Sequence, residues 1–212
     1  MGVPRIEDDT IITWLDLETT GLPESDPDIL EIGVILTRGP ELEELAEMNL
    51  LTHRPELGPA ATRNRSSEIP KKMHQESGLW QEHSDPSGNT LPYNDAESAI
   101  IELIDRYNAR GSYMGGASIT FDRTLLSWHM PRLLGALSYR SLDISSVALF
   151  LSSKMSLPYL GERVPHRALG DLRANIMQYR AYRDMITIKS PEEWSDSTRE
   201  QIKLGSSNLT QH

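Results

Sequence analysis

The chain has 212 residues, which is enough for one domain with a buried core and marginal for two. It carries 31 acidic and 21 basic residues, and the resulting net charge of −10 argues against an enzyme that tracks along long nucleic acid. Cysteine is absent, which excludes disulfides and thiolate metal sites and leaves oxygen and imidazole as the available metal ligands.

Neither a membrane span nor a leader is expected from the sequence. No apolar run approaches the roughly 18 residues that span a bilayer, and residues 1–9 are polar and acidic, unlike a signal peptide. We therefore expect a soluble, cytoplasmic protein.

Strands are predicted in succession near the start of the chain. Short apolar runs rich in β-branched residues predict three of them: Ile11–Leu17, Ile29–Thr37 and a segment within Leu45–Thr52. Such a succession favours an antiparallel meander that opens a mixed sheet. Proline, glycine and polar residues predict irregular chain in three places: Pro23–Asp28, Arg54–Pro70 and Gln81–Asn94. A short helix is expected at Ile69–Leu79.

Helices alternate with strands farther along the chain. Asp95–Tyr107 has apolar residues at the spacing of one helical face, with Asp95 as the expected N-cap. The elements expected after it are a strand at Tyr113–Gly116, a helix at Phe121–His129, a strand at Leu142–Ile144, a helix up to Ser153, a loop at Ser156–Pro165 and a long helix at His166–Met185. This order indicates an α/β domain, which we place at residues 10–186, between an N-terminal segment 1–9 and a polar appendage or tail at 187–212.

Two acids stand at the end of the first expected strand. Residues two apart on a strand point to the same face, so Asp16 and Glu18 would repel each other unless a cation joins them. The alternative is that the strand simply ends in solvent at this point. Taken alone, the pair does not decide between a site and an exposed strand end.

Three further polar residues indicate a functional site only when they are taken together with this pair. Asp122 lies near the start of an expected helix, where a single Asp is ordinarily a partner of the helix dipole. His166 and Asp171 lie five residues apart, so they converge only if His166 lies in the loop before the helix, as Pro165 suggests. Together, four carboxylates and one imidazole supply what phosphodiester hydrolysis requires: oxygen ligands for two Mg²⁺ or Mn²⁺ ions, and a base that titrates near neutral pH.

Three segments resemble the exonuclease motifs of the DEDDh class, which has a ribonuclease H-like fold: Trp14–Leu22, Asp122 and His166–Asp171. Within this class the chain is most similar to the oligoribonuclease family, over about residues 10–186. The similarity extends to three more segments: Met73–Leu79, Gly116–Arg123 and Tyr139–Ser145. The resemblance implies an α/β fold with a mixed five-stranded sheet flanked by helices. It also implies a 3′→5′ exoribonuclease that hydrolyses dinucleotides and other very short RNA to mononucleoside 5′-phosphates.

The resemblance also implies roles for particular residues. The metal ligands would be Asp16, Glu18, Asp122 and Asp171, and the general base would be His166. Leu22 would pack on a base of the substrate, with Thr19 as a further substrate-binding residue beside it. His74 and Ser145 would contact the 5′ phosphate, and Tyr139 and Arg140 from a partner subunit would cap that phosphate. A cap over the 5′ phosphate by residues of a partner subunit would require a homodimer and would block the binding of longer RNA.

Two positions depart from the residues usual in that family. Thr19 stands where relatives usually carry Met, and Ile69 stands where they usually carry Trp. Loss of an aromatic wedge would remove base stacking worth about 1–3 kcal/mol. A general single-strand 3′→5′ exonuclease on DNA or RNA therefore remains an alternative. A second alternative is a non-catalytic module on the same fold that binds nucleotides or a protein.

Several other residues have structural and functional interpretations. Glu31, on the second strand, is interpreted as structural or as a support for the metal ligands. Trp14 and Trp128 are expected in the core, whereas Trp80 is either core or a platform for a base. A basic cluster near His74 is either a solvated loop or an attractor of substrate phosphate: Arg63, Arg65, Lys71 and Lys72.

Overall fold

The computed structural model describes residues 5–85, 90–153 and 166–186. The chain divides into two compact units, residues 1–180 and 181–212, and the first unit holds the sheet and every residue of the candidate site. The loop predicted at Ser156–Pro165 and the tail predicted at 187–212 lie outside the described residues. The predicted domain boundaries stay predictions.

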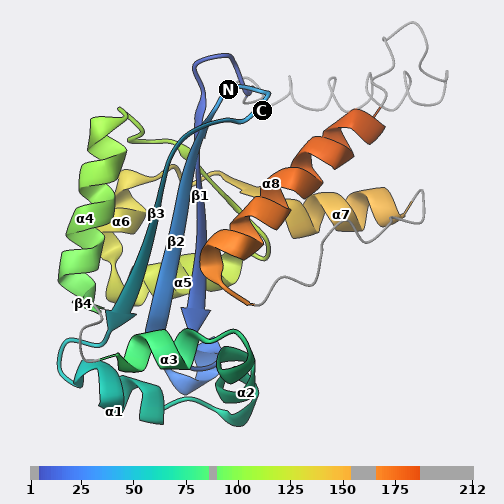
Figure 1. Ribbon diagram of the computed structural model, residues 1–212. Helices are drawn as coiled ribbons and strands as arrows, with labels where there is room; N and C mark the ends of the chain where they lie inside the picture. Colours follow the sequence, from blue (N-terminus) through green and yellow to red (C-terminus); the bar gives the residue numbers. More distant parts are fainter. Residues whose placement is uncertain (1–4, 86–89, 154–165, 187–212) are drawn as a thin grey trace, which may run out of the picture. The chain divides into compact units, whose positions relative to one another are not determined.

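A mixed sheet of six strands forms the centre of the first unit, in the order β4-β3-β2-β1-β5-β6 (Figure 1). The strands are β1 (Ile11–Thr19), β2 (Ile29–Arg38), β3 (Glu43–His53), β4 (Leu91–Pro92), β5 (Tyr113–Gly116) and β6 (Ser141–Asp143). β1, β2 and β3 pair antiparallel, whereas β5 runs parallel to β1 and β6 runs parallel to β5. The predicted meander and mixed sheet are confirmed. The five expected strands are joined by a sixth, because β4, within the segment expected as a loop, pairs with the end of β3.

The helical elements complete the described chain. They are the 3-10 turn η1 (Pro23–Ser25), α1 (Gly58–Asn64), α2 (Glu68–Glu76), α3 (Leu79–Ser84), α4 (Tyr93–Arg106), α5 (Thr120–His129), α6 (Pro131–Ala136), α7 (Ile144–Ser152) and α8 (Ala168–Met185). Within the described residues, no helix is both long enough and apolar enough to cross a membrane.

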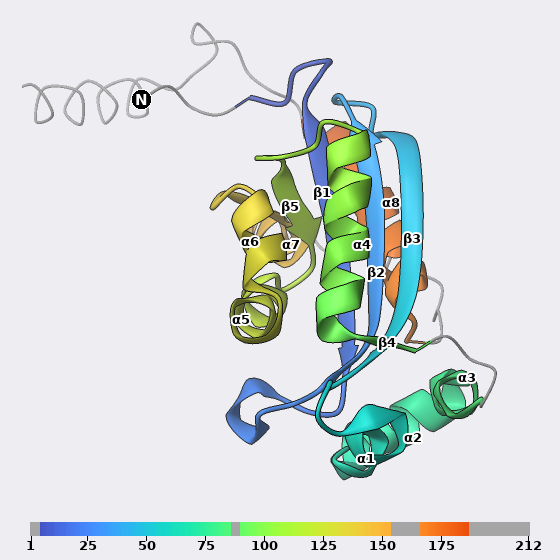
Figure 2. The same cartoon turned by 90° about the vertical axis from the view of Figure 1, so that its left-hand side faces the viewer.

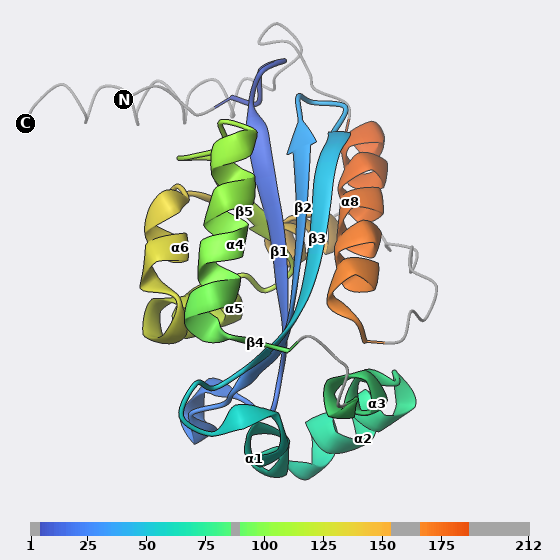
Figure 3. The same ribbon diagram turned by 60° about the vertical axis from the view of Figure 1, so that its left-hand side comes forward.

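Helices cover both faces of the sheet (Figures 2 and 3). On the face of α4, α5 and α6, side chains such as Leu15 and Ile100 belong to one continuous core. On the face of α8, Trp14 lies edge-on to Tyr179 with 6.2 Å between ring centroids. Because both faces are covered, β2 is buried along almost its whole length and appears in the sequence as a nearly continuous apolar run.

Helices α1, α2 and α3 lie beyond the end of the sheet at which β1 ends (Figures 1 and 2). The prediction of irregular chain over Arg54–Pro70 is wrong for α1, which begins with Pro59 in its first turn, where proline is favourable. The helix predicted at Ile69–Leu79 is confirmed as α2, but Gly78, with a φ of +77°, separates it from α3. The loop predicted at Gln81–Asn94 is wrong at both ends, which belong to α3 and α4.

Two other sequence predictions need correction. The helix predicted at Asp95–Tyr107 begins earlier, after Pro92, so Asp95 lies in the first turn of α4 rather than at its N-cap. Its negative charge there still faces the positive end of the helix dipole. Trp14 is fully buried as predicted, whereas Trp128 is 50% exposed on α5 and does not belong to the core.

Candidate active site

The end of β1 and the start of α8 bring three carboxylates together. Asp16 and Glu18 lie two residues apart on β1, and Asp171 lies in the first turn of α8. One oxygen from each side chain lies within 4.8 Å of an oxygen from each of the others. Glu18 is buried and Asp171 is half-buried, so the cluster is partly screened from water.

His166 lies just outside α8. The helix begins at Ala168 rather than at the predicted His166, so the five-residue offset does not turn His166 away from Asp171. His166 Nδ1 lies 3.9 Å from Asp171 Oδ2, and the His166 side chain is 61% exposed. The imidazole therefore lies on the solvent side of the carboxylate cluster.

Asp122 approaches β1 from α5. Its side chain is buried, and its Oδ1 accepts the backbone N–H of Leu17 at 3.2 Å, between the two acids of the strand. Burial and the negative charge of Asp16 raise the pKa of Asp122 well above its usual value. All four predicted carboxylates thus lie at the end of β1, with three of them in the tight cluster.

Burial is the largest cause that raises the pKa of each member of the cluster. Burial, followed by the charges of Asp171 and Glu31, raises the pKa of Asp16 to about 7. Burial, followed by the charge of Asp16, raises the pKa of Glu18 to about 9, and burial also raises the pKa of Asp171. A divalent cation would relieve this repulsion in place of protons. Because all the donors are carboxylate oxygens, the residues fit a hard ion such as Mg²⁺ or Mn²⁺.

An ion-pair network holds the residue next to His166. Arg167 donates from Nε and Nη2 to the fully buried Glu31 at 2.7–3.1 Å, and from Nη1 to Glu82 at 2.7 Å. Glu31 also accepts the backbone N–H of Ala168 at 3.1 Å, which fixes the start of α8. The sequence interpretation gave a supporting role to Glu31 but none to Arg167 or Glu82. The available signal was that Arg167 directly follows His166.

Gly33 of β2 allows α8 to begin close to the sheet. A Cβ atom at Gly33 would lie 2.8 Å from Ala168 Cβ, which is closer than two side chains can approach. Gly33 is the neighbour of Asp16 in the β1–β2 pair. The lack of a side chain at Gly33 therefore brings the start of α8 close to the strand that carries the acids.

Two of the predicted substrate-binding residues are accessible near the cluster. Leu22 follows the end of β1 and is 68% exposed. Ser145 is the second residue of α7, and its Oγ lies 3.2 Å from the Oγ of Ser118. Both side chains are thus available to a ligand at this end of the sheet.

Thr19 and His74 are buried instead. Thr19 Oγ1 donates to the carbonyl oxygen of Gly21 at 2.8 Å. His74 Nε2 lies 2.8 Å from the Thr19 carbonyl oxygen, and its Nδ1 lies 3.7 Å from Glu18 Oε2. The ring also meets Trp80 edge-on, with 5.2 Å between centroids. Burial lowers the pKa of His74, so its imidazole is neutral at neutral pH.

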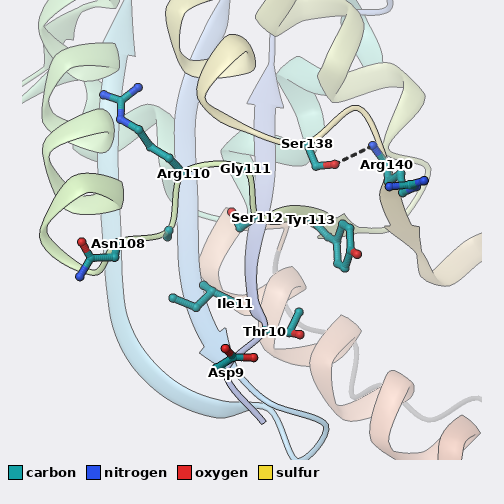
Figure 4. Close-up of a pocket in the computed structure, with 11 residues that line it drawn as sticks. Asp9, Thr10, Ile11, Asn108, Arg110, Gly111, Ser112, Tyr113, Ser138 and Arg140 are labelled. Atoms are coloured by element: carbon teal, nitrogen blue, oxygen red, sulfur yellow. Dashed lines mark hydrogen bonds between the residues drawn. The ribbon is translucent and has the colours of Figure 1, made fainter. Parts of the chain in front are cut away.

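Tyr139 and Arg140 lie away from the carboxylates of their own chain. Tyr139 is 74% exposed, and the Arg140 guanidinium carbon lies 4.9 Å from its ring centroid. Arg140 lines a pocket of about 350 Å³ near Ile11, where β1 begins (Figure 4). Asp16, the nearer of the two acids of β1, lies five residues farther along the strand, which is about 17 Å at roughly 3.3 Å per residue. The structure therefore does not bring Tyr139 and Arg140 to the cluster within one chain.

Comparison with known proteins gives a consistent family match. A model of the Exonuclease family (RNase_T) matches residues 13–179. The chain is 32% identical to an oligoribonuclease of Dichelobacter nodosus over 181 residues, covering 84% of this chain and 95% of that protein. It is 30% identical to an oligoribonuclease of Streptomyces griseus over 194 residues, covering 89% and 92% of the two chains.

A solved structure shares the fold. The chain is similar to Exonuclease I from Methylocaldum szegediense, with a TM-score of 0.52 and 17% sequence identity. The match covers 81% of this chain and 40% of that one, so the chain spans well under half of the solved protein.

Proposed function

We propose that this chain, which belongs to the exonuclease family and within it to the oligoribonucleases, hydrolyses very short RNA from the 3′ end to mononucleoside 5′-phosphates. The observation that carries the proposal is the convergence of Asp16, Glu18 and Asp171, with oxygens within 4.8 Å of one another, beside an exposed imidazole. Similarity to oligoribonucleases over most of the chain supports the substrate class.

Four carboxylates would hold two divalent ions, Mg²⁺ or Mn²⁺: Asp16, Glu18, Asp122 and Asp171. Bound ions of this kind supply Lewis-acid stabilisation of the phosphate oxygens and make water a stronger nucleophile. Burial, followed by the charges of neighbouring carboxylates, raises the pKa values of these groups, and bound cations would offset the cost of keeping these buried carboxylates ionised.

His166 is proposed as the general base. Its Nδ1 lies 3.9 Å from Asp171 Oδ2, and a proton on Nδ1 would leave Nε2 to accept a proton from the attacking water. The exposure of the ring allows this proton to pass to solvent afterwards. Arg167 keeps the backbone next to His166 in place through its bonds to buried Glu31.

The substrate would lie over Leu22 and Ser145, with its 5′ phosphate held by Tyr139 and Arg140 of a second copy of the chain. The separation of Arg140 from the carboxylates of its own chain supports this arrangement, because Arg140 then acts only in a homodimer. Leu149 and Phe150 are exposed on α7, the helix that follows edge strand β6, and support a dimer interface at this edge of the sheet. Substrate contacts of the buried Thr19 and His74, and a cytoplasmic location, remain predictions.

Turnover of a labelled RNA dinucleotide, compared with that of twenty-nucleotide RNA and DNA, tests the proposal. We expect cleavage that requires Mg²⁺ or Mn²⁺, stops in EDTA and is fastest on the dinucleotide. Equal or faster cleavage of the long strands would identify a general single-strand exonuclease. The 82% exposed Ile69 on α2 favours this second candidate, because it offers no aromatic wedge. Binding without any turnover would indicate a non-catalytic module.

A further inference from the structure

A second candidate site lies among helices α1, α2 and α3, outside the carboxylate cluster. It is an open pocket of about 580 Å³, within the range of roughly 300–1,000 Å³ that is usual for small-ligand sites. Six of its lining residues carry the argument: Arg63, Asn64, Lys71, Gln75, Trp80 and Gln81. None of them belongs to the proposed catalytic residues.

The charges around this pocket favour an anion. Its lining includes two cations and no carboxylate, although the chain as a whole has a net charge of −10. Among the described residues, Arg63 has no ion pair, and its Nε is buried without a hydrogen-bond acceptor. Lys71 is paired only with the highly exposed Glu68, at 3.8 Å. The lining thus carries a guanidinium with no compensating carboxylate, and an anion in the pocket would supply the opposite charge.

Arg65 and Lys72, the members of the basic cluster that lie outside the pocket, have ion-pair partners, as Lys71 does. Arg65 pairs with Asp26 and with buried Asp28, at 3.3 and 2.8 Å. Lys72 pairs with Glu76 at 3.8 Å. The contrast distinguishes Arg63 from the rest of the basic cluster seen in the sequence.

Trp80 gives the pocket a fixed aromatic wall. Its Nε1 donates to the Lys71 carbonyl oxygen at 2.7 Å, and its ring lies perpendicular to the rings of His74 and His83. Three side-chain amides share the lining, and amides offer both donors and acceptors to the edge of a nucleobase: Asn64, Gln75 and Gln81. An aromatic wall, amides and two cations together match a nucleotide better than they match a simple anion.

We propose that this pocket is an accessory binding site for one nucleoside monophosphate unit, with the phosphate on Arg63 and Lys71 and the base against Trp80. The occupant is either a free mononucleotide or one nucleotide of an RNA strand, since both offer the same chemistry. Contacts connect the pocket to the carboxylates, because Trp80 packs on His74 and His74 lies 3.7 Å from Glu18. The alternative in which the occupant is one nucleotide of an RNA strand rests on the proposed function, whereas binding of a free nucleotide does not.

Isothermal titration of the full chain in EDTA tests the site without turnover. We expect 5′-AMP to bind more tightly than either adenosine or inorganic phosphate. Because a hydrogen bond to a charged group is lost, Arg63→Gln and Lys71→Gln should each weaken AMP binding by about tenfold or more. Lys72→Gln is the matched control, since Lys72 lies on the same helix but does not line the pocket, and its AMP affinity should not change.

Three results would overturn the proposal: no AMP binding, equal affinity for AMP and inorganic phosphate, or unchanged AMP affinity in Arg63→Gln with an unchanged circular dichroism spectrum. The source of the nucleotide is distinguished by KM values of Arg63→Gln for a dinucleotide and a seven-nucleotide RNA. If KM rises for the seven-nucleotide RNA but not for the dinucleotide, the occupant of the pocket is one nucleotide of an RNA strand. Unchanged KM values with weakened AMP binding identify a free mononucleotide. Because the titration needs no turnover, it can succeed even if the proposed function fails.

Discussion

Replacing Arg167 with Gln tests whether the ion pair to Glu31 fixes the start of α8. The substitution leaves the fully buried Glu31 carboxylate without its cation, and the loss of one partner from a buried pair costs about 3–5 kcal/mol. The second pair, to the half-exposed Glu82, adds at most about 1 kcal/mol. For a unit of this size each kcal/mol lowers Tm by about 2–4 °C, so we expect Tm to fall by about 6–24 °C.

The matched control is Arg173→Gln on the same helix. Arg173 is half-exposed and pairs with half-exposed Glu44 and Glu47, so this substitution should cost less than about 1 kcal/mol. Thermal unfolding of both variants at neutral pH measures the difference. Equal small shifts in Tm would refute the view that the Arg167–Glu31 pair holds α8.

A kinetic measurement separates positioning of His166 from general stability. If Arg167 positions the base, the folded Arg167→Gln enzyme should lose kcat more than tenfold at a temperature well below its Tm, because small displacements of catalytic groups cost about a hundredfold in rate. KM should change much less. An unchanged kcat in the folded variant would show that Arg167 acts on stability alone.

Three other predictions follow from the same geometry. In the metal-free folded protein the pKa of Asp16 is raised to about 7 and that of Glu18 to about 9, so both carboxyl groups hold protons more tightly than in the unfolded chain. Their contribution to stability is fully present below the ordinary pKa values of these groups and is lost as pH rises through the raised pKa values. Tm in EDTA should therefore fall between pH 6.5 and about pH 9.5, and Mn²⁺ should remove the fall; a flat profile in EDTA would contradict this. Gly33→Ala should lower stability by about 1–3 kcal/mol, measured by urea unfolding, because its Cβ would meet the start of α8 at 2.8 Å. Arg140→Ala and His166→Ala should each abolish turnover of the dinucleotide, but mixing the two after reversible dissociation should restore part of it, since a mixed dimer has one intact site; no recovery would argue against a cap from the partner.

Local patterns in the sequence were sufficient for the elements with a strong period. β1 and β2 are apolar runs rich in β-branched residues, and the alternation of side chains along a strand places Asp16 and Glu18 on one face. β4 has two residues and no period, so only its pairing with the end of β3 defines it. Trp128 illustrates a different failure, since its helix was predicted but its orientation toward solvent depends on how α5 packs.

Contacts between distant residues explain what the sequence could not show. Arg167 meets Glu31 and Glu82, which lie 136 and 85 residues away in the sequence. His74 is buried against Thr19, 55 residues earlier, although its sequence motif predicted a contact with substrate. In each case the residue type was visible, but the partner depends on how α2, α3 and α8 pack at the end of β1.

The charge of the chain also bears on substrate length. With a net charge of −10, the protein as a whole repels RNA phosphates, and divalent cations on the proposed metal ligands would offset this repulsion at the site. Further attraction must come from cationic side chains, of which Arg63 and Lys71 line one pocket and Arg140 lines another. An RNA with one or two phosphates can use these local contacts fully, whereas each additional phosphate meets mainly the negative field of the protein. The proposed preference for very short RNA therefore has an electrostatic cause that operates in addition to a cap from a partner subunit.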